Sequence, residues 1–289
     1  MKKSFILIVC FLFLINESRA GSGSAFFWSA ESDSAKVYML GSVHLADSSF
    51  YPLDLEIESA FNGSDVLVLE LNLDKIDPFS ILNKGMYSGD TTLSDVLSPG
   101  VYSKLAKRMT DLGLPEQAYK RMRPWFAVMT LQLAETKNIG YSSEYGIDLY
   151  FLKKSEKNEK VTDALETMEM QINAFMEMDA EPDKFVAYML EDDANSTETV
   201  QKMMNYWKNG QRDKLAEYLD GIYNEDGRFK NFTDEILYKR NEKMADKIES
   251  FLNTGKTYFV IAGAAHFLGE GSIIDILEKK GYKITYPKD

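Results

Sequence analysis

The pattern of apolar and polar positions at the start of the chain predicts alternating strands and helices. Apolar and β-branched runs at 25–30 and 36–40 flank a short polar turn, which is typical of a β-hairpin. Apolar residues at helical spacing follow at about 52–61. The run Asp65–Leu71 is then almost continuously apolar, with one acid, Glu70, near its end. Such a run favours a strand that is covered on both faces.

The end of the chain repeats this order. Apolar residues at helical spacing over 232–252 precede an apolar strand at 257–262. A second helix is predicted at about 269–280, closed by glycine, and a short strand at 282–286. The two ends of the chain therefore predict strands that belong to one sheet.

The middle of the chain, about residues 75–230, is predicted to be largely helical. Its apolar residues recur with a period of 3.6, and Gly and Pro separate the helical segments. Only 161–165 predicts a strand there, at a point where Glu166 follows the apolar residues. We therefore expect an α/β fold over residues 21–289, as a single domain. Its small mixed central sheet would be assembled from both ends of the chain and covered by many helices.

The first twenty residues have the pattern of a secretory signal peptide. Lys2 and Lys3 precede an apolar run over 5–15, and Ser18-Arg19-Ala20 places small residues where a signal peptidase reads. The apolar run is only about eleven residues long, which is too short to span a bilayer. We expect residues 1–20 to be removed and the protein to be secreted or periplasmic.

Composition narrows the possible chemistry and partners. Cys10 is the only cysteine and lies in the expected signal, so disulfides, thiolate catalysis and zinc–thiolate sites are excluded from the mature chain. The net charge of −12 disfavours binding to nucleic acid or anionic lipid. No later apolar stretch is long enough to be a transmembrane segment. A peptide or small-molecule substrate is the expected partner, and the oligomeric state stays open.

Two histidines are the main candidates for chemistry. His44 and His266 are the only ones in the chain, and each stands three residues after a glycine that follows an apolar strand. One such histidine alone is more often a packed core residue. Two in equivalent turns indicate a shared site, because ligands of α/β folds bind where strands end and helices begin. Imidazole is also the commonest protein ligand of divalent transition metals.

Three charged residues extend this candidate site. Without cysteine, a third metal ligand must be an acid, and Glu70 is the best placed, although a solvated strand-end acid is an equal alternative. Arg240 lies on the apolar stripe of its helix, where it either meets an anion or extends to the surface. Glu166 closes the middle strand and either orients a ligand or caps the next helix.

Short motifs that contain these residues occur in a fixed order along nearly the whole chain after residue 20. They are Gly41-Ser42-Val43-His44, Val66–Leu71, Arg123-Pro124-Trp125, Tyr145-Gly146-Ile147-Asp148, Ala164–Thr167 with Gln171, Arg240-Asn241, and Phe259–Gly269. This ordered set resembles the TraB/GumN superfamily, which includes the Tiki metalloproteases. The resemblance implies an EreA/ChaN-like core and a divalent-metal site made by His44, Glu70 and His266.

The resemblance also suggests a reaction. The leading hypothesis is a metal-dependent hydrolase, a Tiki-like protease that would use Mn, Co or Zn to polarise a scissile carbonyl and activate water. Glu70 or Glu166 would accept the proton of that water, and Arg240 would stabilise the oxyanion by about 3 kcal/mol. Two alternatives stay open. One is a carrier of haem or metal, and the other is a non-catalytic envelope or polysaccharide accessory protein of the GumN type.

Overall fold

The computed structural model describes residues 23–72, 77–190, 196–224 and 230–286. The expected signal peptide, residues 1–20, lies outside this part of the chain. Within the described part, no helix has both the length and the apolar character needed to cross a membrane.

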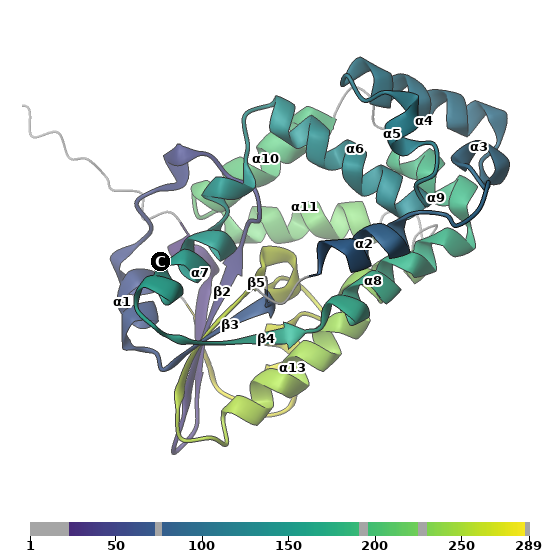
Figure 1. Cartoon of the computed structure of the whole chain (residues 1–289). Helices are drawn as coiled ribbons and strands as arrows, with labels where there is room; N and C mark the ends of the chain where they lie inside the picture. Colours follow the sequence, from purple (N-terminus) through teal and green to yellow (C-terminus); the bar gives the residue numbers. More distant parts are fainter. Residues whose placement is uncertain (1–22, 73–76, 191–195, 225–229, 287–289) are drawn as a thin grey trace, which may run out of the picture.

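A mixed sheet forms the centre of the described structure (Figure 1), and it confirms the expected α/β class. Its order is β4-β3-β5-β2-β1-β6, and β2, β5, β3 and β4 run parallel while β1 is antiparallel to both of its neighbours. The strands are β1 (Phe27–Glu31), β2 (Lys36–Ser42), β3 (Val66–Leu71), β4 (Val161–Glu166), β5 (Thr257–Gly263) and β6 (Ile284–Thr285). Because β5 lies between β2 and β3, both ends of the chain build the sheet, as expected.

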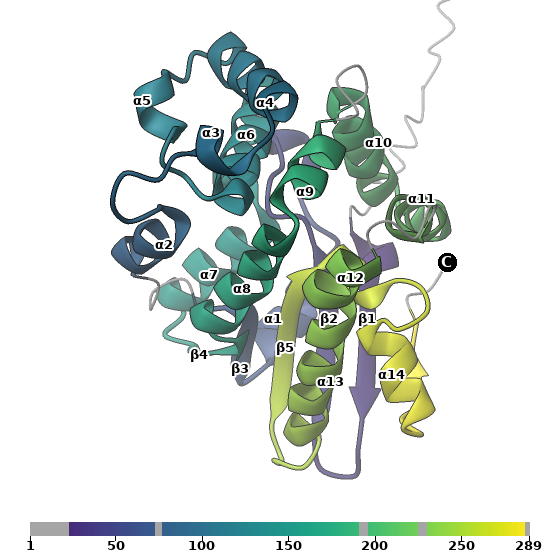
Figure 2. The ribbon, with the colours of Figure 1, turned by 90° about the vertical axis from the view of Figure 1, so that its right-hand side faces the viewer.

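Helices cover both faces of this sheet. Figures 1 and 2 show α1 (Leu55–Gly63) and α7 (Ile147–Lys157) on one face, and α13 (Lys239–Phe251) and α14 (Ile273–Lys279) on the other. The interior strands β3 and β5 are buried along almost their full length. This double cover explains why the two strands are continuous apolar runs in the sequence.

Most of the middle segment forms a separate group of helices, here called the helical lobe. Its helices share a second apolar cluster that includes Leu105, Trp125 and Leu131. They are α2 (Pro78–Gly85), α3 (Leu93–Val96), α4 (Pro99–Asp111), α5 (Glu116–Tyr119), α6 (Pro124–Asn138), α8 (Met168–Met176) and α9 (Pro182–Met189). The lobe lies beyond the end of the sheet at which the parallel strands finish (Figures 1 and 2).

The next helices of the middle segment return to the sheet. They are α10 (Ser196–Lys208), α11 (Arg212–Asn224) and the short α12 (Lys230–Thr233). Trp207 of α10 is fully buried in the sheet's apolar core, and its indole N–H donates to the carbonyl of Gly41 at 2.8 Å. This bond ties α10 to the strand that precedes His44.

Two predicted helices differ from the observed ones for local reasons. The span 232–252 is interrupted by a π-helical stretch, η6 (Asp234–Tyr238), before α13 begins. The Arg240 side chain donates to the Ile236 carbonyl inside that stretch, and π-helical turns often occur at functional sites. The helix expected from 269 begins only at Ile273, because Gly269 and Gly271 adopt positive φ angles of 79° and 71°.

Candidate functional site

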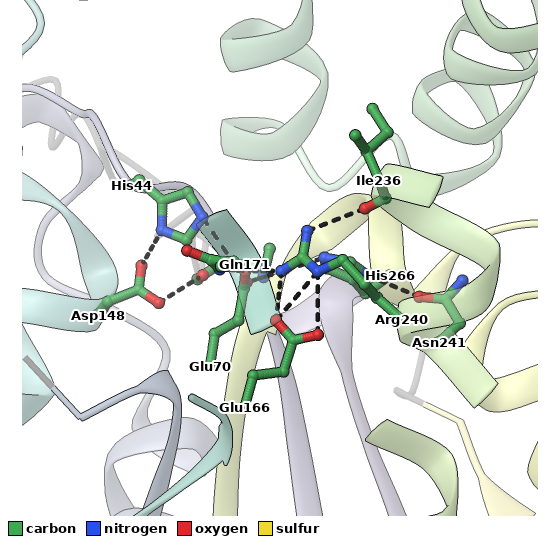
Figure 3. Close-up of polar contacts among 11 residues, drawn as sticks. His44, Glu70, Asp148, Glu166, Gln171, Ile236, Arg240, Asn241 and His266 are labelled. Atoms are coloured by element: carbon green, nitrogen blue, oxygen red, sulfur yellow. Dashed lines mark hydrogen bonds and ion pairs between the residues drawn. The ribbon is translucent and has the colours of Figure 1, made fainter. Parts of the chain in front are cut away.

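The carboxyl ends of the four parallel strands bring the predicted site residues together (Figure 3). His44 follows β2 by two residues, Glu70 and Glu166 lie at the ends of β3 and β4, and His266 lies in the short η7 turn (Ala264–Phe267) after β5. Parallel strands end at one edge of a sheet, which is where ligands of open α/β folds bind. Arg240 reaches the same edge from α13.

One oxygen of Glu70 faces both histidines. Glu70 Oε2 lies 3.9 Å from Nε2 of His44 and 3.9 Å from Nε2 of His266. The two imidazoles therefore lie within twice that distance of each other, although more than two hundred residues separate them in the sequence. The matched histidine turns thus contribute to one site.

The glycines of the two turns make this approach possible. A Cβ atom on Gly41 would lie 3.1 Å from the Cα of Ala264, and one on Gly263 would lie 3.4 Å from Nε2 of His44. Neither glycine has a positive φ angle. Gly41 in particular leaves room for the other motif, and neither glycine is required by a left-handed backbone conformation.

His266 is held in one tautomer. It is buried, and its Nδ1 lies 2.6 Å from Oδ1 of Asn241. Because the amide of Asn241 donates to the Gly271 carbonyl at 2.8 Å, its oxygen is the atom that faces the imidazole. Burial lowers the pKa of His266 to about 4, so the ring is neutral and carries its proton on Nδ1. The lone pair of Nε2 then points toward Glu70.

His44 is arranged in the same way but in a more open position. Its Nδ1 lies 3.0 Å from Oδ2 of Asp148, and Ser42 donates to the other oxygen of that carboxylate at 3.1 Å. The side chain is 60% exposed, against 7% for His266. The carboxylate of Asp148 raises the pKa of His44 to about 9. Both histidines thus bond an acceptor through Nδ1 and present Nε2 to Glu70.

The second oxygen of Glu70 is engaged elsewhere. Oε1 accepts hydrogen bonds from Arg240 and, at 2.6 Å, from the amide of Gln171. Burial alone would raise the pKa of Glu70, but its interactions with His266, His44 and Arg240 outweigh burial and lower the pKa to about 2. Glu70 is therefore an ionised carboxylate with only one oxygen turned toward the histidines.

Arg240 and Glu166 form a buried ion pair behind Glu70. The Nε atom of Arg240 lies 3.0 Å from both Glu166 oxygens, and Nη2 lies 2.8 Å from one of them. Nη1 donates to the Ile236 carbonyl at 2.9 Å. The Glu166 side chain is 0% exposed and that of Arg240 is 11% exposed. Arg240 is thus turned inward, while the N-terminus of α8 is capped by the side chain of Thr167 and not by Glu166.

The three candidate ligands suit a divalent metal in donor type. Two imidazole nitrogens and one carboxylate oxygen suit Mn, Co or Zn. Ligands of a tetrahedral ion at 2.0–2.1 Å are about 3.3–3.4 Å apart, so the observed 3.9 Å spacing is wider by roughly half an ångström. Within the described residues, no group of three His, Cys, Asp or Glu side chains is placed so that it could hold a metal ion.

Three residues that matter here had no assigned role in the sequence analysis. Asp148, Asn241 and Gln171 each bond a histidine or Glu70. All three stand in the motifs that carry the family resemblance, which was the available signal. Polar side chains on helices seldom reveal from sequence alone which neighbour they orient.

The fold and the residues at the carboxyl ends of its parallel strands define an α/β protein with a buried glutamate between two histidines. The chain belongs to the TraB/PrgY/gumN family, whose model matches residues 26–286. No solved structure matches the chain significantly.

Curated relatives carry the name metalloprotease. Metalloprotease TIKI1 of Danio rerio is 24% identical over 316 residues, which cover 91% of this chain and 63% of that protein. Metalloprotease TIKI2 of Xenopus tropicalis is 24% identical over 91% of this chain and 60% of its own length. A Metalloprotease TIKI homolog of Nematostella vectensis is 44% identical over 59 residues, 20% of this chain and 12% of that protein. The chain spans less than two thirds of the length of these proteins.

Proposed function

We propose that this protein is a metal-dependent hydrolase of the metallopeptidase type, in which His44, Glu70 and His266 hold one divalent ion. One observation carries the proposal. A single ionised oxygen of Glu70 is equally distant from two Nε2 atoms, and the Nδ1 atom of each ring is already bonded to an acceptor. Once His44 has released its second proton, two imidazole nitrogens and one carboxylate oxygen converge, an arrangement that favours a cation between them.

The bound ion would polarise a scissile carbonyl and make a water molecule more acidic. The chain's own residues have narrower tasks. Glu70 faces the histidines through one oxygen, and the proposal gives it both ligation and acceptance of a proton. Glu166 does not suit proton transfer because both of its oxygens are bonded to Arg240 and its side chain is not exposed.

Arg240 receives a different role from the one that the sequence suggested. Its guanidinium is bonded to two carboxylates and one carbonyl, which leaves it poorly placed to meet a developing oxyanion. In this proposal Arg240 fixes the orientation of Glu70, and Glu166 fixes Arg240. Both act as positioning residues for the proposed ligand and have no contact with substrate.

Peptide substrates are proposed because the curated relatives are named metalloproteases. A location outside the cytoplasm is proposed from the pattern of residues 1–20. The acidic net charge supports substrates other than nucleic acid.

The test combines metal binding with hydrolysis. Mn, Co and Zn are titrated by calorimetry into chelator-treated protein, and a peptide library is then digested with and without chelator. Glu70→Gln should weaken metal binding by more than about 100-fold, because a neutral amide is a poor ligand. This loss exceeds the 10–100-fold expected from removing a residue that only orients a ligand. Glu70→Gln should abolish cleavage as well.

The matched control is Glu31→Gln, the same change on an exposed acid at the far end of the β1–β2 hairpin. This variant should bind metal and cleave as the wild type does. If Glu70→Gln binds metal normally, the ligand assignment is wrong. If the wild type cleaves nothing with any metal and instead binds haem stoichiometrically through both histidines, the protein is a carrier.

A further inference from the structure

The sheet has two lateral edges, one at β6 and one at β4. Within the described residues, β6 pairs with β1 alone and β4 pairs with β3 alone. β6 (Ile284–Thr285) has only two residues, too few to hold an incoming strand. β4 (Val161–Glu166) has six residues and lies at the outer side of the sheet in Figure 2. Of the two edges, that of β4 therefore needs protection against pairing with another chain.

The backbone of Ala164 shows how the open side of β4 is occupied. Its N–H group donates to Oδ1 of Asp163 at 2.8 Å, and its carbonyl accepts a hydrogen bond from Nζ of Lys247. The N–H and C=O groups of one strand residue point to the same side, so both groups of Ala164 are turned away from β3. The two groups that a further strand would bind at this position are therefore already bonded to side chains.

Asp163 and Lys247 also bind each other. Nζ of Lys247, which reaches β4 from α13, lies 3.3 Å from the same Oδ1 of Asp163. The side chains are 34% exposed for Lys247 and 48% exposed for Asp163. An ion pair with this exposure contributes little to stability, because water and salt screen it. Stability alone thus does not explain why two charged side chains bind the backbone of this strand.

The surroundings of β4 would otherwise favour pairing. Val161, at the start of the strand, is β-branched and 62% exposed. A cavity of about 630 Å³ lies beside the strand, and its described walls include residues 163–166 of β4 together with Met168 and Ile172 of α8. The cavity leaves room for side chains of an added strand. Charged side chains on an edge strand are a common means by which proteins prevent such pairing.

We propose that Asp163 and Lys247 close the lateral edge of β4 and so prevent two copies of this chain from joining their sheets edge to edge. Each side chain occupies one backbone group of Ala164, and an incoming strand would have to displace both. The strand that is kept out is β4 of a second copy, because two identical edges can pair about a twofold axis. This role is separate from the proposed hydrolase function.

The experiment removes both side chains and measures the mass of the protein in solution. Asp163→Ala combined with Lys247→Ala leaves the net charge unchanged, so altered long-range repulsion cannot explain the result. Sedimentation velocity over a range of concentrations should show a mass about twice that of the wild type or larger. The melting temperature should stay within about 2–4 °C of the wild-type value, because the lost ion pair is exposed.

Two further variants identify the surface. Asp246→Ala combined with Lys280→Ala removes the same two residue types from an exposed ion pair on α13 and the end of α14, and this control should sediment as the wild type does. Ala164→Pro, added to the variant without Asp163 and Lys247, removes the outward N–H group. It should abolish the self-association, because proline is tolerated on an edge strand but cannot donate to a neighbour. Circular dichroism checks that this variant folds.

Three results would overturn the proposal. The first is a variant without Asp163 and Lys247 that sediments as the wild type does. The second is equal self-association of the Asp246 and Lys280 control. The third is a folded Ala164→Pro variant that still associates, because the contact then lies elsewhere. If the proline variant does not fold, hydrogen exchange decides: the Ala164 amide should exchange more slowly in the associated state, and an unchanged rate contradicts pairing through β4.

Discussion

The carboxyl-terminal edge of the sheet and the helical lobe differ in the parts of the chain that build them. The edge collects His44, Glu70, Glu166 and His266 from four strands spread over most of the sequence, and each has directed hydrogen bonds or ion pairs. The lobe consists mainly of consecutive helices joined by apolar contacts. Parallel strands bring residues that are far apart in the sequence to one edge, where chemistry can occur, whereas helices close together in the sequence can bury an apolar cluster of their own.

Of the changes that test this difference between the two regions, Glu166→Gln has the largest expected effect on stability. It removes the charge from one partner of a buried ion pair and leaves Arg240 with less compensation, so the free energy of unfolding should fall by about 3–5 kcal/mol. Metal affinity should fall as well, by about tenfold at most, because Glu166 orients Glu70 only through Arg240. Urea unfolding and calorimetry measure the two effects.

The control for this change is an exposed ion pair of the lobe. In the pair of Lys184 with Glu181, the side chains are 72% and 64% exposed. Lys184→Ala should therefore change stability by no more than about 1 kcal/mol. Similar losses of unfolding free energy in both variants would contradict the larger contribution expected from the buried ion pair.

Leu105→Ala tests whether the lobe is independent of the metal ligands. Leu105 is fully buried in the lobe's own cluster, so its truncation should cost about 2–5 kcal/mol of stability. Metal affinity of the folded protein should stay within about twofold of wild type, since no ligand is touched. Thermal unfolding with a metal titration checks both values, and a large loss of affinity would mean that the two regions are coupled.

Asn241→Ala has a smaller expected effect and acts on one ligand. His266 would lose the acceptor that fixes its tautomer, which should weaken metal binding by about 10–100-fold. Nitrogen NMR of the imidazole should then show loss of the single Nδ1-protonated form in chelator-treated protein. Asn241→Asp keeps an acceptor oxygen and should restore that form. An unchanged spectrum in the alanine variant would contradict the positioning role of Asn241.

The sequence predicted the fold and the residues that gather at the candidate site. It did not predict most of the contacts between those residues. Continuous apolar strands and repeated Gly-x-x-His motifs were enough to place β2, β3 and β5 and to bring the two histidines together. The pairing of Arg240 with Glu166 was not predictable, because an inward arginine is compatible with several anions. The π-helical stretch before α13 receives a hydrogen bond from Arg240 at the Ile236 carbonyl, and a periodicity argument predicted a plain helix there.

The order of the strands has a consequence for how the chain acquires its structure. β5, residues 257–263, is the strand between β2 and β3, so the N-terminal hairpin and β3 have no shared neighbour until β5 has been made. The sheet therefore closes late during synthesis, through contacts between residues more than two hundred positions apart. Until then β2 and β3 each have an edge without its neighbouring strand, a condition in which incomplete chains aggregate. A ribosome-bound chain that stops before residue 257 should accordingly be sensitive to proteases and should bind chaperones.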